Sequence, residues 1–233
     1  METNIGSEAQ WAYDPAKLHW SGRSEWVQTP QQERSQAGMV AVLECATRLF
    51  ARHGFENTTI AMISRESGTS TAAIYRRFSD KSAILRAIVD HWSTAWMHDF
   101  ERIWQTADLG SASPQDILRF HIEILFSAFR SDPGLLREID RQCNYDPAVA
   151  SIMAVMDRRS AEALLAALAE ASGTAPEILH PGVVRVTWIV RSTLGMAVQR
   201  EQLGLWPPFT IHDDALKEIL VDMAFAVLMP SCC

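Results

Sequence analysis

Two helix-ending glycines divide residues 36–81 of this chain into three short helices, and this spacing constrains the fold more than any other feature. Apolar residues recur three or four positions apart over 36–53, as they do on one buried helix face. Gly54 follows this segment and Gly68 follows the next, because glycine adopts the left-handed conformation that ends a helix at little steric cost. Hydroxyl residues that can cap a helix come before each of the two later helices: Thr58 or Thr59, and then Ser70 or Thr71.

The third of these helices, from about residue 71 to 78, has one apolar and one polar face. Ile74 and Phe78 are four residues apart, so we expect both to pack in the core. The other face carries small, hydroxyl and guanidinium side chains: Thr71, Ala72, Tyr75 and Arg76. A short helix with such a face, held rigidly by the helix before it, fits the major groove of DNA, which is about 12 Å wide.

This pattern resembles the helix-turn-helix domain of the TetR family of bacterial transcriptional repressors. The resemblance covers about residues 40–85 and rests on these positions: Phe50, Gly54, Thr58–Thr59, Gly68, Ser70, Ile74–Tyr75, Phe78 and Lys81. Two residues depart from the commonest pattern, since Thr69 stands where an aliphatic residue is usual and Ala72 where glycine is common. The resemblance implies an all-α fold, with an N-terminal helix-turn-helix DNA-binding domain and a C-terminal helical ligand-binding and dimerisation domain.

The same resemblance implies three segments: an N-terminal extension, partly disordered, over 1–35, a DNA-binding domain over 36–90, and an effector-binding and dimerisation domain over 91–233. The DNA-binding residues that it implies are Thr59, Ser70, Thr71, Ala72, Ala73, Tyr75, Arg76 and Lys81. Lys81 begins the fourth helix, where its charge opposes the positive end of the helix dipole. A DNA phosphate that binds both groups would remove this conflict.

The charge distribution agrees with a DNA-binding segment only when the chain is divided by region. The whole chain has a net charge of −7. Residues 36–91 nevertheless carry seven basic and five acidic side chains, whereas residues 92–233 carry eleven basic and eighteen acidic ones. The acidic part should keep other faces of the protein away from DNA.

The rest of the chain predicts further helices over about 81–104, 114–131, 135–143, 147–172, 183–202 and 213–228. The helix over 183–202 is unusually apolar and β-branched, and the helix over 213–228 has a broad apolar stripe. Two such helices from each subunit can form a four-helix interface, so we expect a homodimer. The alternative is that both are ordinary core helices.

Aromatic and methionine residues on these helices are candidates for an effector site. The candidates are Trp92, Trp96, Phe120, Met153, Met156, Trp188 and Arg191, and the nearby Trp104, Phe126, His91 and His121 are also of interest. Such stripes also occur in plain cores, and a histidine in them can be structural. Arg191 lies in an apolar helix and needs an anionic partner there, either a carboxylate or a ligand.

Other features bound the function without identifying it. The extension contains Trp11, Tyr13, Trp20 and Trp26. It is either a mobile tail or partly docked, because exposed indole rings are unfavourable. Cys45, Cys143, Cys232 and Cys233 have no zinc-binding spacing. We see no catalytic motif, so we expect neither an enzyme nor a cofactor or metal. No apolar run approaches the roughly 20 residues of a membrane span and no signal pattern is present, so we expect a cytoplasmic protein without a membrane partner.

Together these features predict a ligand-responsive, DNA-binding transcriptional regulator. We expect a repressor that binds a palindromic operator in double-stranded DNA as a homodimer and is released by a small hydrophobic effector. The alternative is a helical small-molecule-binding or adaptor protein without DNA binding.

Overall fold

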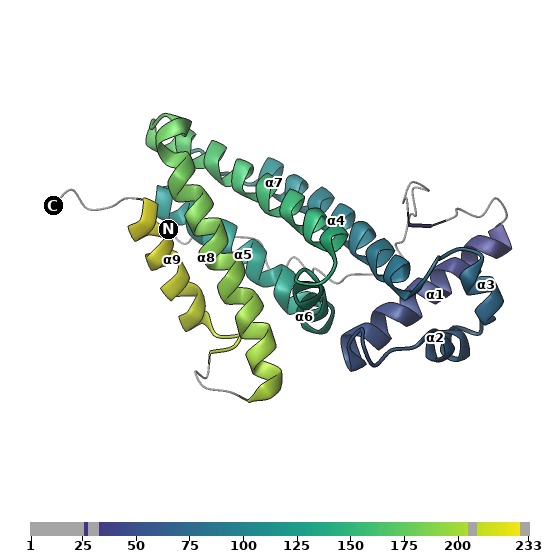
Figure 1. The fold of residues 1–233 in the computed structure, drawn as a ribbon. Helices are drawn as coiled ribbons and strands as arrows, with labels where there is room; N and C mark the ends of the chain where they lie inside the picture. Colours follow the sequence, from purple (N-terminus) through teal and green to yellow (C-terminus); the bar gives the residue numbers. More distant parts are fainter. Residues whose placement is uncertain (1–25, 28–32, 205–208, 229–233) are drawn as a thin grey trace. The chain divides into compact units, whose positions relative to one another are not determined.

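The structure is a computed structural model that describes residues 26–27, 33–204 and 209–228. These residues form nine helices and no strand, so the predicted all-α fold class is confirmed (Figure 1). The helices are α1 (Glu33–His53), α2 (Ile60–Ser67), α3 (Thr71–Tyr75), α4 (Lys81–Thr106), α5 (Pro114–Ser131), α6 (Pro133–Gln142), α7 (Pro147–Ser172), α8 (Pro176–Leu203) and α9 (Asp214–Leu228). None of these described helices is both long and apolar enough to span a bilayer.

The described chain divides into two compact units. The first, called the head unit below, comprises residues up to 99 together with 133–156, and so contains α1, α2, α3 and α6. The second, called the body unit, comprises 100–132 and the residues from 157 onward, and so contains α5, α8 and α9. Helices α4 and α7 each contribute residues to both units. The three predicted segments stay a prediction.

The head unit is built on the apolar face of α1. The six apolar residues predicted for this face are all buried: Met39, Val42, Leu43, Ala46, Leu49 and Phe50. Cys45 and Thr47 of α1 are buried as well. Helix α1 packs against both α2 and α6, and α2 packs against α3. Ile63 of α2 and Ile74 of α3 are completely buried, and Phe78 is 1% exposed. Each short helix is therefore anchored by a large apolar side chain.

The helix ends in the head unit follow from local chemistry. Gly54 and Gly68 both have positive φ, of 80° and 67°, as expected for residues that end helices. Thr59 is the N-cap of α2, because its hydroxyl accepts from the Met62 backbone N–H. Ser70 is the N-cap of α3 and accepts from the Ala73 backbone N–H. Of the residues that the sequence offered as caps, Thr59 rather than Thr58 therefore caps α2, and Ser70 rather than Thr71 caps α3.

Part of the N-terminal extension docks on the head unit. Val27 is 8% exposed, and the Trp26 ring lies 4.9 Å from the guanidinium carbon of Arg86 in α4. Arg86 also pairs with Asp146, with 2.7 Å between Nε and Oδ2. The remaining aromatic residues of the extension, Trp11, Tyr13 and Trp20, lie outside the described residues.

In the body unit, α5 packs against both α8 and α9, and α8 packs against α9. Ser113 and Asp116 form a capping box at the start of α5. Ion pairs join α5 to α9, including Arg119 with Glu218 and Glu123 with Lys217, each at 2.8 Å. These pairs fix the position of α9 on α5 at the surface of the unit.

The predicted start of α8 is wrong. The sequence placed it after Pro181 and Gly182, but α8 begins at Pro176 and contains Pro181. Proline there removes only one backbone hydrogen bond, in the second turn, and its exposed position lets water reach the freed Glu177 carbonyl. Gly182 permits close packing, since a Cβ atom there would lie 2.9 Å from Cδ2 of Leu228 in α9.

Candidate nucleic-acid interface

The third helix turns its apolar side inward and its polar side to solvent. Ile74 is fully buried, whereas Tyr75 on the next position is 54% exposed. Thr71, Ala72 and Arg76 are also exposed, and Ala73 is half-buried. Four of the predicted DNA-binding residues therefore lie on α3 itself, with the exposed Ser70 and Arg76 as its N-cap and C-cap. A helix that presents this face can enter a groove of DNA without unfolding.

The arrangement around α3 is rigid because several contacts fix its ends. The Thr71 hydroxyl donates to Ser64 Oγ of α2 at 3.4 Å. After α3, the Phe78 backbone N–H donates to the Ile74 carbonyl at 3.0 Å. Burial and the neighbouring Arg76 lower the pKa of Arg77, whose guanidinium is half-buried and lies near Gly38 of α1. Of the two adjacent arginines, Arg76 is therefore the one that faces solvent.

Lys81 has a role that the sequence did not predict. Its ammonium donates to the carbonyl oxygens of Phe55 at 2.6 Å and Thr58 at 2.8 Å, and it lies 4.1 Å from the Phe55 ring centroid. Burial lowers the pKa of this ammonium. Lys81 therefore ties the loop between α1 and α2 to the start of α4. A contact between Lys81 and a DNA phosphate stays a prediction, and it would compete with these carbonyls.

The end of α1 is held by α6 through contacts to the Ala51 backbone. Arg137 Nη2 donates to the Ala51 carbonyl at 3.0 Å, which gives a cation to the negative end of α1. Gly134 lies so near that an added Cβ would be 3.0 Å from the same oxygen. The sequence did not reveal this contact between α1 and α6, because its partners lie more than 80 residues apart and neither belongs to a motif.

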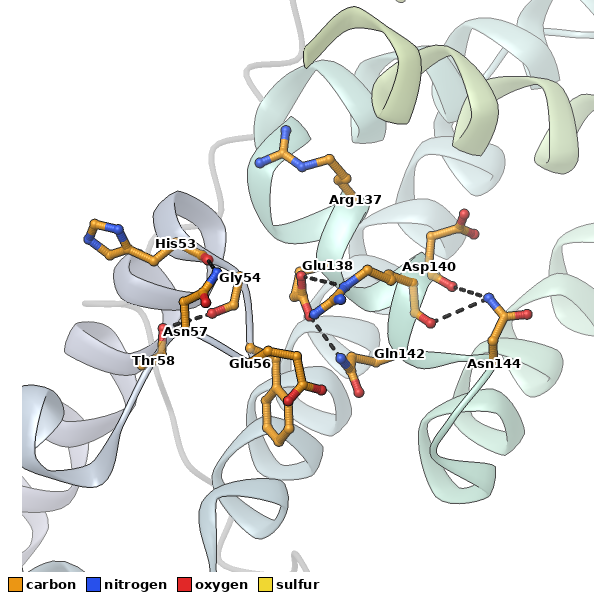
Figure 2. Close-up of polar contacts among 12 residues, drawn as sticks. His53, Gly54, Glu56, Asn57, Thr58, Arg137, Glu138, Asp140, Gln142 and Asn144 are labelled. Carbon is orange, nitrogen blue, oxygen red and sulfur yellow. Dashed lines mark hydrogen bonds and ion pairs between the residues drawn. The ribbon is translucent and has the colours of Figure 1, made fainter. Parts of the chain in front are cut away.

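A buried carboxylate lies beside this contact between α1 and α6. Glu138 of α6 is 5% exposed and accepts from Arg141 Nη2 and Gln142 Nε2, each at 2.9 Å (Figure 2). The hydrogen bond to Glu138 raises the pKa of Arg141. A Cβ on Gly54 would come within 3.4 Å of Glu138 Oε2, so α6 packs closely on the turn that follows α1. These contacts make α6 a structural part of the head unit.

The predicted effector-site residues divide between the two units. In the head unit, the side chains of Trp92, Trp96, Met153 and Met156 are all buried, with 5–7% exposure. In the body unit, Phe120 is 6% exposed, whereas Trp188 is 71% exposed and faces outward from α8. Their role in ligand binding stays a prediction.

Arg191 has the carboxylate partner that its position required. Its Nε lies 3.7 Å from Oδ1 of Asp157, and its guanidinium carbon is 5.2 Å from the Phe129 ring centroid. These contacts all lie within the body unit. A protein carboxylate therefore satisfies the charge that the sequence left without an identified partner.

A second group of aromatic residues surrounds His121 of α5. The His121 side chain is 1% exposed, and burial lowers its pKa to about 4. Its ring centroid lies 5.8 Å from that of Trp104 and 6.2 Å from that of Phe100. Trp104 in turn meets Phe120 edge-on at 5.2 Å. All four residues belong to the body unit. Because burial lowers the pKa of His121, its imidazole is neutral near pH 7, and aromatic rings surround it.

Several large apolar side chains of α8 and α9 in the body unit are exposed to solvent. Among them are Val184, Trp188 and Met196 of α8, with Ile219 and Met223 of α9. Their exposure ranges from 42% for Ile219 to 71% for Trp188. Where exposed apolar side chains gather in one patch, they mark an interaction surface.

The described cysteine and acidic residues do not form a metal site. No group of three or more His, Cys, Asp or Glu side chains in the described ranges could hold a metal ion. Cys45 is buried in α1, and burial raises the pKa of its thiol. Cys232 and Cys233 lie outside the described residues.

The fold and the exposed helix together define a helix-turn-helix protein, and comparisons with known proteins specify its type. The family described as bacterial regulatory proteins, tetR family, matches residues 42–88. YerO of Bacillus subtilis strain 168, described as an uncharacterised HTH-type transcriptional regulator, is 33% identical over 89 residues. That match covers 38% of this chain and only 30% of YerO. Residues 42–88 are thus a helix-turn-helix domain of the TetR family, and the predicted resemblance is confirmed.

Solved structures are similar over most of the chain. A protein from Saccharomonospora viridis, solved in complex with choline, has a TM-score of 0.65 at 18% identity, over 82% of this chain and 96% of that one. The transcriptional regulator FadR from Bacillus subtilis, solved in complex with stearoyl-CoA, has a TM-score of 0.59 at 15% identity, over 79% and 96%. At these identities the likeness establishes the fold, an N-terminal helix-turn-helix domain followed by a helical region.

Proposed function

We propose that this protein is a ligand-responsive transcriptional regulator that represses its target by binding a palindromic operator as a homodimer. The observation that carries the proposal is the orientation of α3, with Ile74 buried and Tyr75 more than half exposed. Two copies of α3 would enter successive major grooves about 34 Å apart, so a two-fold symmetric protein would recognise a symmetric site. Such a protein acts on DNA in the cytoplasm and needs no catalytic group.

Within this proposal the exposed residues of α3 have distinct tasks. Ala72 is small and lets the backbone approach the base edges, while the hydroxyl groups of Thr71 and Tyr75 can donate to bases or phosphates. Arg76 faces solvent and supplies the guanidinium for a phosphate or guanine contact. Thr59 begins α2, where its backbone N–H and hydroxyl can bind a phosphate oxygen.

The exposed apolar face of α8 and α9 supports a homodimer. Trp188 and Met223 would be buried if the same face of a second copy packed against it, giving four helices at one interface. The interface is self-complementary, since each subunit presents the same two helices. A dimer also compensates for the small positive charge of residues 36–91, because two DNA-binding domains would bind one operator together.

Effector binding would release the dimer from DNA by favouring a conformation whose heads are spaced wrongly for the operator. Helix α4 is suited to transmit this change, because residues 81–99 belong to the head unit and residues 100–106 to the body unit. A shift from 1% to 99% of one state needs about 5.5 kcal/mol of differential affinity. The choline and stearoyl-CoA bound in two proteins of similar fold support small-molecule control here.

The decisive experiment is selection of bound duplexes from a random library, followed by titration of the enriched site. We expect a palindrome to be enriched. Tyr75→Ala should weaken its binding by about fivefold or more, as the loss of a groove contact costs about 1–3 kcal/mol. Tyr145→Ala is the matched control, because Tyr145 is 75% exposed in the same head unit but lies after α6. If no duplex is enriched at low salt, the adaptor alternative replaces this proposal.

A further inference from the structure

Three buried polar atoms in the body unit have no hydrogen-bond partner among the described residues: Nε1 of Trp104, Nδ1 of His121 and Oγ1 of Thr187. Two of them, Trp104 Nε1 and His121 Nδ1, belong to the aromatic cluster around His121. A buried polar group without a partner costs about 1–3 kcal/mol, and native proteins leave few such groups. Both atoms also lie in one cluster, since the two rings are 5.8 Å apart between centroids. One explanation therefore has to account for both.

The other nitrogen of His121 is already engaged. Ser160 Oγ of α7 lies 3.4 Å from His121 Nε2, and Ser160 is itself 3% exposed. If Nε2 donates to this hydroxyl, Nδ1 is an acceptor, and if Nε2 accepts, Nδ1 is a donor. In either tautomer Nδ1 needs a partner, and the indole N–H of Trp104 needs an acceptor. A hydroxyl group meets both needs, because it can donate and accept at once.

We propose that Trp104 and His121 form the polar contact point for an uncharged, mainly aromatic or alicyclic ligand that carries a hydroxyl group. The hydroxyl oxygen accepts from Trp104 Nε1 and the hydroxyl proton is donated to His121 Nδ1, while the ligand body packs among Phe100 and Phe120. The inference rests on the proposed function, because it specifies the chemistry of the effector.

The charge of the site favours a neutral ligand over an anion. The imidazole is buried and uncharged near neutral pH, so it cannot balance a carboxylate. Arg191 of α8, the cation that the sequence offered to an anionic ligand, pairs with Asp157. Apolar packing against the rings of Phe100, Trp104 and Phe120 supplies most of the affinity, whereas the ligand's hydroxyl group supplies selectivity.

The test compares three ligands with the same ring system: 2-naphthol, naphthalene and 2-naphthoate. Binding to the full-length protein is measured by titration calorimetry at pH 7.5. We expect 2-naphthol to bind about tenfold more tightly than naphthalene, which lacks the hydrogen bonds, and more tightly than the anion. Trp104→Phe and His121→Phe each keep an aromatic ring but remove one polar atom, so each should reduce the advantage of naphthol over naphthalene. Trp26→Phe, in the head unit, is the control and should keep it.

Several results would overturn the inference. One is equal affinity for naphthol and naphthalene, and another is tighter binding of the naphthoate. A third is no binding of any of the three ligands up to their solubility limits. That third result would indicate that only water forms hydrogen bonds with Trp104 Nε1 and His121 Nδ1. A preference that survives both Trp104→Phe and His121→Phe would also overturn it. Failure to bind DNA would instead refute the proposed function, and the calorimetric comparison would remain interpretable.

Discussion

Replacing Gly134 by alanine should destabilise the head unit, although the same change usually stabilises a helix. An added Cβ at this position would lie 3.0 Å from the Ala51 carbonyl oxygen and 3.1 Å from the Ala51 Cβ. Favourable contacts between such atoms need about 3.5–4.0 Å, so α6 and α1 must move apart by several tenths of an ångström. The obstacle is backbone rather than a flexible side chain, so it cannot rotate away.

The expected magnitude follows from two opposing terms. Overpacking of a tight contact costs about 1–3 kcal/mol. Alanine is better than glycine in a helix interior by about 1 kcal/mol, and by less at Gly134, which is the second residue of α6. We therefore expect a net loss of about 1–2 kcal/mol in the free energy of unfolding. Separation of the helices should also lengthen the bond between Arg137 and the Ala51 carbonyl.

Gly38→Ala provides the matched control. Gly38 lies within α1, and its added Cβ would be 3.8 Å from the nearest neighbouring atom, a side-chain nitrogen of Arg77. This is an ordinary contact, so Gly38→Ala should stabilise the protein by about 0.5–1 kcal/mol. Urea unfolding at one fixed protein concentration would compare the variants, since dimerisation makes stability concentration-dependent. Equal stabilisation by both substitutions would refute the close contact between α1 and α6.

Three other predictions follow from particular contacts. Lys81→Met should lower the free energy of unfolding by about 1–3 kcal/mol, since it leaves loop carbonyls without their charged donor; a change only in the salt dependence of DNA binding would favour a phosphate contact instead. Trp188→Glu should convert a dimer to a monomer in sedimentation at micromolar concentration, and an unchanged dimer would exclude the α8–α9 face. Burial lowers the folded-state pKa of His121 from 6.5 to about 4. The free energy of unfolding should therefore keep its full value above pH 6.5 and fall by up to about 1.4 kcal/mol per pH unit between pH 6.5 and pH 4. His121→Phe should flatten this dependence on pH.

The sequence predicted the elements of the head unit well because their signals are local. Helical spacing of apolar residues, a positive-φ glycine and a capping hydroxyl all act within about four residues of the backbone that they shape. Gly54 and Gly68 therefore end α1 and α2 as expected. The same locality explains the buried Ile74 beside the exposed Tyr75, since neighbouring positions on a helix point in different directions.

The start of α8 could not be predicted from the same kind of signal. A Pro-Gly pair usually precedes a helix or interrupts one, but Pro181 and Gly182 lie inside α8. Helix α9 packs against Gly182, and this tertiary contact compensates for the weak local preference. The partner of Arg191 was also undetermined, because a sequence does not tell which carboxylate lies nearby.

The sequence alone determined that this chain is helical, that about residues 40–85 form a helix-turn-helix domain, and which side of its third helix is polar. The tertiary structure alone decided that Lys81 binds backbone carbonyls, that Arg137 caps α1, and that the rings of Trp104 and His121 lie side by side. The physical reason is the range of the interactions. Capping and helical periodicity depend on neighbours in the chain, whereas the partner of a long polar side chain depends on which distant segment packs beside it.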